Sequence, residues 1–130
     1  MQIFATEKYI YMEPICKLKD IYKALYNFEK SFAENNGITI NEGMLLCCLK
    51  DGNPKSANEL CDFMGLSNSR VSRVINSVET KGYILREMGT ADRRQMIFSL
   101  TESGRCKTEE MRSKGMDFSE LKTQIINFLV

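Results

Sequence analysis

The sequence predicts a mainly α-helical fold with one small β-hairpin, and three observations support this. Apolar residues recur at helical spacing over most of the chain. Serine or threonine stands three residues before glutamate at two expected helix starts, which is the pattern of a capping box. Further along, the runs YILREM and QMIFSL are rich in β-forming residues and flank the turn sequence GTADRR. At 130 residues, the chain suits a single domain with one hydrophobic core.

Composition excludes several classes of protein and site. The chain has no histidine, and its five cysteines form no CxxC pair, so neither a zinc site nor a disulfide framework is expected. Glu7 and Lys8 interrupt the apolar N-terminal stretch, which therefore lacks the core of a signal peptide. No run approaches ~20 apolar residues, the length of a membrane span. We therefore expect a cytoplasmic protein with no metal, no cofactor and no membrane segment.

The N-terminal third is expected to form two helices. The first covers residues 15–34, where apolar residues make a wide stripe at helical spacing. The sequence Asn-Asn-Gly at 35–37 closes this helix with residues that tolerate left-handed geometry. Thr39 then stands three residues before Glu42, and this capping box opens a second helix that runs to about residue 49. The sequence Asp-Gly-Asn-Pro that follows predicts a turn.

The next segment fits a helix-turn-helix. Ser56 and Glu59 repeat the capping box and open the short helix ANELCDFM, after which Ser67 caps a longer helix, NSRVSRVINSVETK. A helix-turn-helix needs apolar residues where its helices meet, a small residue where they cross closely, and glycine at the turn. Suitable residues fill these positions: Leu60, Cys61, Met64, Gly65, Leu66, Val71 and Val74. This spacing explains Cys61 as a packing residue rather than a reactive thiol.

The longer helix has two different faces. Its core-facing side carries valine and isoleucine at helical spacing, namely Val71, Val74, Ile75 and Val78. Its other side carries Ser69, Ser72, Arg73 and Asn76, with Arg70 beside them. Arginine reads guanine, asparagine reads adenine, and serine binds bases or phosphates. Residues 65–100 carry six cations against three acids, a net +3. Both features favour a nucleic-acid-binding face, and a solvated polar face without a partner is the alternative.

A hairpin that directly follows a helix-turn-helix is the wing of a winged helix. The tip of this wing carries Asp92, Arg93 and Arg94. Asp92 can pair with one arginine and hold the shape of the loop, which leaves the other arginine to point outward. A narrow minor groove has an enhanced negative potential that attracts inserted arginine. We therefore expect the wing tip to contact the DNA backbone and minor groove while the longer helix occupies the major groove.

Two more helices are expected after the hairpin. Thr101 can cap a helix over residues 102–112, which Gly115 ends. Apolar residues then recur at helical spacing to the end of the chain, with Phe118, Leu121, Ile125 and Phe128 among them. This stripe either joins two subunits or packs on the first helix of the same chain.

The run from Ser56 to Gly104 resembles the DNA-binding lobe of the MarR family of bacterial transcriptional regulators. The signature is the sequence DRR at 92–94, a strand, and SLTESG at 99–104, preceded by a helix that ends in Lys81 and Gly82. The resemblance implies a homodimer that binds double-stranded DNA at a pseudo-palindromic operator as a transcriptional regulator, in particular a repressor. It also implies that Arg94 enters the minor groove, while Arg93 contacts phosphate or the protein itself.

This resemblance divides the chain and assigns its site residues. Residues 1–37 form an N-terminal arm and dimerisation helix, 38–100 the winged helix-turn-helix lobe, and 101–130 the C-terminal dimerisation helices. The expected DNA-binding residues are Ser56, Ser67, Ser69, Arg70, Ser72, Arg73, Asn76, Arg86, Asp92, Arg93 and Arg94. The expected dimer interface is formed by Ile15, Leu18, Tyr22, Phe118, Leu121, Ile125 and Phe128. The apolar residues within 1–12 are interpreted as an arm that completes this interface.

Three alternatives and one additional partner remain. A winged helix can serve as a protein-protein interaction module, although such a module has no need for two adjacent wing arginines. A thiol-based redox-sensing regulator would use Cys16, which lies near the start of the first helix. A thiol-dependent enzyme lacks a histidine to act as the base, so no catalytic residue is assigned. A small-molecule effector is the additional candidate partner, since methionines can line an adaptable pocket.

Overall fold

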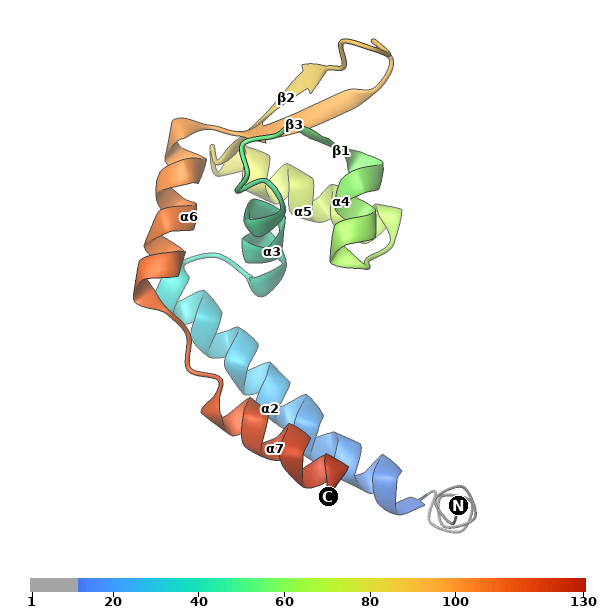
Figure 1. Cartoon of the computed structure of the whole chain (residues 1–130), viewed down its shortest axis with the longest axis vertical. Coiled ribbons are helices and arrows are strands. Elements are labelled where there is room, and N and C mark those ends of the chain that lie inside the picture. Colours follow the sequence, from blue (N-terminus) through green and yellow to red (C-terminus); the bar gives the residue numbers. More distant parts are fainter. Residues whose placement is uncertain (1–11) are drawn as a thin grey trace. The chain divides into compact units, whose positions relative to one another are not determined.

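The computed structural model describes residues 12–130 of the chain (Figure 1). Most of the described residues are helical, with three short strands between α3 and α6. The elements follow in the order α2 (Met12–Asn36), α3 (Ile40–Cys48), β1 (Lys55–Ser56), α4 (Ala57–Met64), α5 (Asn68–Thr80), β2 (Ile84–Met88), β3 (Met96–Leu100), α6 (Glu102–Lys114) and α7 (Ser119–Leu129). The expected mainly α-helical fold with a hairpin wing is confirmed. The arm expected within residues 1–12 lies outside the described residues.

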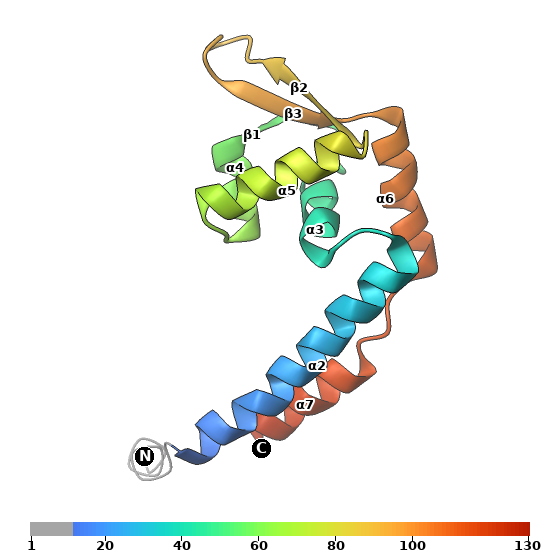
Figure 2. The same cartoon turned by 180° about the vertical axis from the view of Figure 1, so that it is seen from behind.

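The chain divides into two compact units, one made of residues 36–115 and the other of residues 116–130 with the part of the chain up to Asn35. In the second of these, α7 lies alongside α2 in both views (Figures 1 and 2). The rings of Phe28 and Phe118 stack with their centroids 4.7 Å apart. Asn27 Nδ2 donates a hydrogen bond of 3.2 Å to Glu120 Oε1. Helix α7 therefore packs on α2 of the same chain.

The core of the unit formed by residues 36–115 lies where α3, α4 and α5 pack together. Both predicted capping boxes are present, at Thr39–Glu42 for α3 and at Ser56–Glu59 for α4. Gly65 follows α4 in the left-handed conformation, with φ 67° and ψ 27°, which glycine adopts without steric cost. The side chains most completely buried are Leu45, Leu46, Leu49, Leu60, Val71 and Val78. The predicted helix-turn-helix is thus a three-helix arrangement with one apolar centre.

The strands form an antiparallel sheet in the order β1-β3-β2. The register of the wing pairs Ile84 with Leu100 and Met88 with Met96, so β2 and β3 are in contact along their full length. Phe98 and Leu100 are buried on one face of the sheet, as the alternation in QMIFSL predicts. The strand β1 was not predicted, because its two residues are too short to show an alternating pattern.

Helix α6 lies in the compact unit of residues 36–115. It packs against α3 and β3, and Thr101 caps it by accepting a 3.0 Å hydrogen bond from Gly104 N. Gly104 lies against the backbone of Tyr83, where a β-carbon would stand 2.0 Å from the carbonyl oxygen. The compact unit that contains the wing thus continues through α6 to Gly115.

Residues 12–130 contain no candidate membrane span and no candidate metal site. No helix between residues 12 and 130 combines the length and the apolar character needed to cross a membrane. In the same part of the chain, no three histidine, cysteine, aspartate or glutamate side chains are grouped so that they could hold a metal ion.

Candidate nucleic-acid interface

Helix α5 presents a polar face to solvent and an apolar face to the core. Val71, Ile75 and Val78 are buried against α3 and α4. The residues expected to contact DNA all lie on the exposed side: Ser69, Arg70, Ser72, Arg73 and Asn76. The hydroxyl of Ser67, the N-cap, accepts a 3.3 Å hydrogen bond from Arg70 N and lies 3.3 Å from the hydroxyl of Ser69. The first turn of the helix is therefore fixed by the residues that lead into its polar face.

The packing role expected of Cys61 agrees with its surroundings. Cys61 is half-buried on α4, and its thiol donates a 3.1 Å hydrogen bond to Asn68 Oδ1 at the start of α5. Gly65 N donates a 2.8 Å hydrogen bond to the Cys61 carbonyl oxygen, which closes the turn between the two helices. Cys61 thus stands where the two helices of the motif meet.

The wing tip is a tight loop held together by Asp92. Its Oδ1 accepts hydrogen bonds from Arg94 N at 3.0 Å and from Arg94 Nε at 3.3 Å. This confirms that Asp92 pairs with one of the two arginines. The rest of the Arg94 side chain extends into solvent, since 93% of it is exposed. Gly89 allows the loop to close, because a β-carbon there would lie 2.7 Å from the Asp92 carbonyl oxygen.

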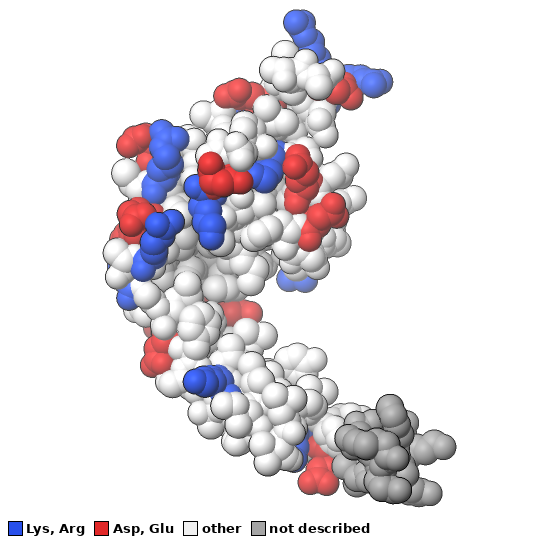
Figure 3. Space-filling model, in the orientation of Figure 1, with Lys and Arg blue, Asp and Glu red and all other residues white. Residues whose placement is uncertain are grey.

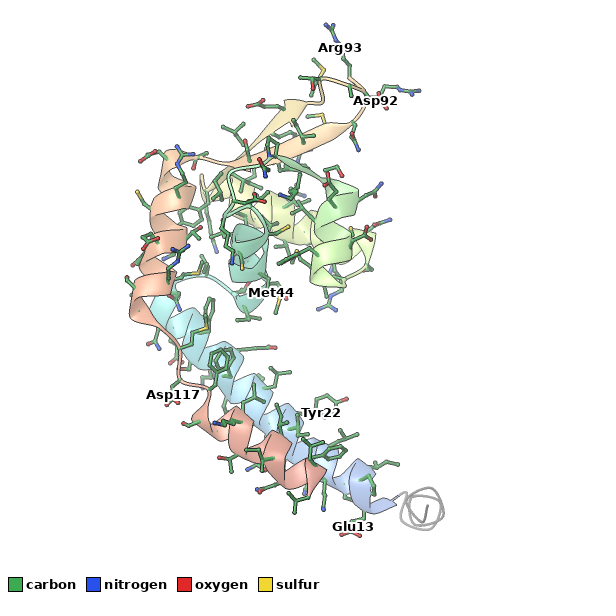
Figure 4. All side chains as sticks on the ribbon, viewed as in Figure 1. Glu13, Tyr22, Met44, Asp92, Arg93 and Asp117 are labelled. Carbon is green, nitrogen blue, oxygen red and sulfur yellow. The ribbon has the colours of Figure 1, made fainter. Side chains whose placement is uncertain are left out.

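Arg93 is the other arginine of the tip, and it points away from the hairpin (Figure 4). Its side chain forms no ion pair or hydrogen bond within the described residues 12–130. Cationic side chains are seen at the end of the wing in the space-filling view, with an acidic group beside them (Figure 3). The tip therefore carries two extended arginine side chains. Arg94 is held by the Asp92 carboxylate, and Arg93 has no such contact among the described residues.

Arg86, on β2, makes its contacts within the protein. Its Nη2 and Nε donate hydrogen bonds to the two carboxylate oxygens of Glu79 on α5, at 3.0 and 3.3 Å. Nη2 also lies 3.5 Å from Asn76 Oδ1. The guanidinium stands over the ring of buried Phe98, 5.2 Å from its centroid. Arg86 thus connects the polar face of α5 to the wing, and its expected role in binding DNA directly is not supported by this position.

A groove of about 480 Å³ separates α5 from the wing and from the start of α4. The side chains from α5 and the wing that line it include Ser72, Asn76, Arg86, Gln95, Met96 and Phe98, and Ser56, Ala57 and Asn58 line it from the start of α4. The groove shows that α5 and the hairpin form one continuous concave surface rather than two separate projections.

Ser56, one of the residues expected to contact DNA, is buried at the start of α4. Its residue surface is only 3% exposed. Its hydroxyl accepts a 3.2 Å hydrogen bond from Glu59 N, and its own N–H donates a 3.0 Å hydrogen bond to Glu59 Oε1. Both polar groups of Ser56 are therefore used to cap α4, at the edge of the groove that the residue helps to line.

Glu42 is an important residue of this unit for which the sequence predicted only a capping role. It is 2% exposed, and its carboxylate accepts hydrogen bonds from Thr39 N (2.7 Å), the Ser77 hydroxyl (2.5 Å) and Lys81 Nζ (2.8 Å to each oxygen). Burial raises the pKa of Glu42, but the hydrogen bonds from Lys81, Ser77 and Thr39 and the charge of Lys81 outweigh it, so the pKa is lowered overall. The carboxylate is therefore ionised, and it connects α3 to the end of α5.

The residues expected at the dimer interface are only partly covered in the single chain. Ile15, Tyr22, Phe118 and Ile125 are exposed, while Leu18, Leu121 and Phe128 are half-buried. Tyr22, of which 67% is exposed, lies on the side of α2 that faces away from α7 (Figure 4). The candidate redox residue Cys16 is also exposed, as a free thiol. Packing of α7 on α2 thus leaves apolar side chains of both helices in contact with solvent.

The chain is similar in sequence to a known protein family and to two curated proteins. Residues 38–96 match the model of the MarR family. Two curated proteins of Bacillus subtilis are similar: the uncharacterized HTH-type transcriptional regulator YwoH is 27% identical over 84 residues, and the HTH-type transcriptional repressor MdtR is 32% identical over 78 residues. These alignments cover 65% and 60% of this chain and 61% and 50% of the relatives, so the chain spans less than two thirds of their length.

A solved structure extends the likeness of fold to nearly the whole chain. It is that of a mutant MarR from E. coli complexed with operator DNA, with a TM-score of 0.72 at 17% identity. The match covers 91% of this chain and 86% of that one. At this level of identity the match establishes the fold.

Proposed function

We propose that this chain, which belongs to the MarR family, is a transcriptional regulator that binds double-stranded DNA as a homodimer. The observation that carries this proposal is the concave surface formed by the polar face of α5 and by a wing whose tip carries Arg93 and Arg94. A merely solvated helix usually mixes glutamate and lysine, whereas this face carries serine, asparagine and arginine. Two adjacent exposed arginines serve no purpose in folding, because like charges repel.

Each part of this surface suits a different groove of DNA. The exposed side of α5 carries short polar side chains and arginines that can form hydrogen bonds, as a helix in the major groove requires. Arg73 and Arg70 are the candidates for guanine or phosphate contacts, and the serines Ser67, Ser69 and Ser72 are candidates for contacts with phosphates or bases. The wing tip would then reach the neighbouring minor groove through Arg94, with Arg93 on the backbone.

A homodimer would cover the apolar side chains that α2 and α7 expose. Single exposed apolar residues are ordinary, but a contiguous group is typical of an interaction surface. The exposed members on these two helices include Ile15, Tyr22, Leu25, Tyr26, Ile125, Ile126 and Leu129. With two-fold symmetry, two copies of α5 would enter successive major grooves about 34–36 Å apart, on a pseudo-palindromic site.

Repression is the mode of regulation that we propose, since the similar protein MdtR is named a transcriptional repressor. A dimer bound over a promoter blocks access of the transcription machinery without any catalytic step, so no enzymatic activity is required. Such a regulator works beside the chromosome, in the cytoplasm. A small-molecule effector and a redox response of exposed Cys16 are compatible additions, and neither is needed for DNA binding.

The test is a fluorescence-anisotropy titration with duplex DNA from immediately upstream of the chain's own gene, beside a scrambled duplex, at two salt concentrations. We expect tight binding to the upstream duplex alone, with log affinity falling by about 0.9 per phosphate contact for each decade of salt. Arg73→Ala should weaken this binding roughly 5- to 150-fold. Arg112→Ala, which removes an exposed side chain of α6 outside the proposed DNA-binding surface, should leave it unchanged.

Two outcomes of this titration would contradict the proposal. If the protein bound both duplexes equally, it would be a basic protein without sequence preference. If it bound neither at low salt, the polar face of α5 would have to meet a protein instead, and the interaction-module alternative would apply.

A further inference from the structure

The contacts of Arg86 bear on how Asn76 is presented to DNA. Nη2 of Arg86 donates to Glu79 Oε1 at 3.0 Å and lies 3.5 Å from Asn76 Oδ1. Nε donates to the other Glu79 oxygen at 3.3 Å, and the guanidinium plane covers the ring of Phe98. The guanidinium is thus held by a carboxylate, an aromatic ring and the side-chain amide of Asn76, which come from α5 and β3.

The chemistry of arginine determines which end of the Asn76 amide faces it. A guanidinium carries only donors, so the atom of Asn76 next to Nη2 must be the carbonyl oxygen. The amide nitrogen, Nδ2, then lies on the other side of the side chain. Asn76 is exposed and lines the groove between α5 and the wing, so Nδ2 is accessible from the surface proposed to meet DNA.

This orientation changes what Asn76 can read. An unconstrained asparagine reads adenine with two hydrogen bonds, in which Oδ1 accepts from N6 and Nδ2 donates to N7. Arg86 occupies one of the two acceptor positions of Oδ1, which leaves Nδ2 as the group best placed to bind a base. A donor alone can bind every base that has an acceptor in the major groove, which are guanine (O6 and N7), adenine (N7) and thymine (O4), so the two-bond preference for adenine is lost.

On the basis of the proposed DNA-binding function, we propose that Arg86 is a positioning residue that makes Asn76 a hydrogen-bond donor in the major groove. Arg86 itself does not contact phosphate. Its charge is compensated by Glu79, so it contributes little to the attraction of the DNA backbone. The specificity of the protein at one base pair of each half-site is therefore set by a residue of the wing strand β2 through a residue of the recognition helix α5.

The experiment compares the binding sites that the wild type and four variants select from a randomised duplex library. Asn76→Ala identifies the base pair at which its side chain acts, because preference there is lost. The second variant, Glu79→Gln with Arg86→Met, removes one negative and one positive charge together and keeps an apolar stem over Phe98. The third, Glu79→Gln alone, is its control. Circular dichroism and thermal unfolding show that each variant is folded.

We expect the wild type to show no preference for adenine over guanine or thymine at the base read by Asn76, and to disfavour cytosine there. In the Glu79→Gln, Arg86→Met variant the selection should move towards adenine by about fivefold or more, because both ends of the amide become available. The slope of log affinity against log salt should stay the same in the double variant. Glu79→Gln alone keeps an acceptor oxygen beside Arg86, so it should move the selection less than the double variant does. With Asn76→Ala added, the double change should alter preference no further at that base pair.

Three other results would contradict this inference or the proposed function on which it rests. A salt slope shallower by about 0.9 in the double variant would mean that Arg86 contacts a phosphate and would overturn the inference. Uniformly weaker binding with an unchanged base preference would mean that Arg86 only stabilises the fold, and would overturn it as well. If the wild type selected no sequence from the library, the proposed sequence-specific function would fail, and this inference with it.

Discussion

Lys81 Nζ lies 2.8 Å from each carboxylate oxygen of Glu42, and this ion pair joins the end of α5 to the first turn of α3. The Ser77 hydroxyl and the Thr39 N–H complete the hydrogen bonds to the same carboxylate. One buried side chain therefore caps α3 and holds the C-terminal end of the helix proposed to read DNA. The angle at which α5 leaves the core depends on these contacts as well as on apolar packing.

Replacing Glu42 with glutamine should destabilise the fold by about 1–3 kcal/mol. The amide oxygen can still accept from one partner, but the amide nitrogen is a donor placed among the donors of Thr39, Ser77 and Lys81. Urea unfolding followed by circular dichroism measures the change. The matched control is Glu109→Gln, which breaks an exposed pair with Arg112 and should cost less than about 0.5 kcal/mol. Equal effects of the two substitutions would contradict the structural role of Glu42.

Stability should also depend on pH through Glu42. Its folded pKa is lowered from the ordinary value of 4.5, so the unfolded chain takes up a proton at a higher pH than the folded chain does. The contribution of the ionised carboxylate is therefore fully present above about pH 4.5 and is lost as the pH falls through the lowered folded value. The free energy of unfolding of the wild type should then fall more steeply from about pH 5 to pH 3 than that of Glu42→Gln. Parallel pH profiles for the two proteins would show that Glu42 has no shifted pKa.

What the sequence could predict depends on how far apart the interacting residues lie. The capping boxes at Thr39–Glu42 and Ser56–Glu59 each span three residues, and both form as expected. The turn at Gly65 and the pairing of Asp92 with a neighbouring arginine are equally local. Periodicity likewise separated the two faces of α5, because one helix imposes one repeat.

Contacts between distant segments could not be read in this way. Glu42 meets Ser77 and Lys81, which follow it by 35 and 39 residues, and no short pattern encodes that meeting. From the sequence, Arg86 was expected to be a cation available to DNA. In the structure, Arg86 pairs with Glu79, and its guanidinium stands over the ring of Phe98. The sequence showed that Ser56 is a cap, but only the packing of β1 and α4 reveals that capping buries its hydroxyl.

Gly104 provides a test of why a glycine stands in the sequence SLTESG. A β-carbon at this position would lie 2.0 Å from the carbonyl oxygen of Tyr83 and 2.9 Å from its carbonyl carbon. Because these are backbone atoms, they cannot turn aside as a side chain could. Gly104→Ala should therefore destabilise the protein by about 1–3 kcal/mol or more through overpacking, as thermal unfolding would measure. Ser103→Ala, at the exposed neighbouring position, should change the melting temperature little; a fully stable Gly104→Ala protein would show that α6 can shift away from Tyr83.

The two wing arginines should differ in what they contribute to DNA binding. Arg93 has no partner among residues 12–130, so we expect it to contact phosphate, and Arg93→Ala should reduce the salt slope by about 0.9 without changing base preference. Arg94 is held by Asp92 and extends into solvent, and we propose that it enters the minor groove, so Arg94→Ala should relax the preference for A·T pairs with a narrow minor groove. Salt titrations and site selection on the two variants measure these effects. If the effects were exchanged, the roles of the two arginines would be reversed.

The dimer proposal predicts different outcomes for two positions on α7. Ile125 is 42% exposed in the single chain, so an aspartate there meets water in the monomer and is buried without a partner only in a dimer. Ile125→Asp should therefore give a folded monomer, which light scattering after size exclusion would detect, whereas Thr123→Asp, at an exposed polar position of the same helix, should remain dimeric. Because a monomer presents a single recognition helix, Ile125→Asp should also lose most of its affinity for a pseudo-palindromic duplex while keeping weak binding to one half-site. A dimeric Ile125→Asp protein would place the subunit contact elsewhere than on this stripe.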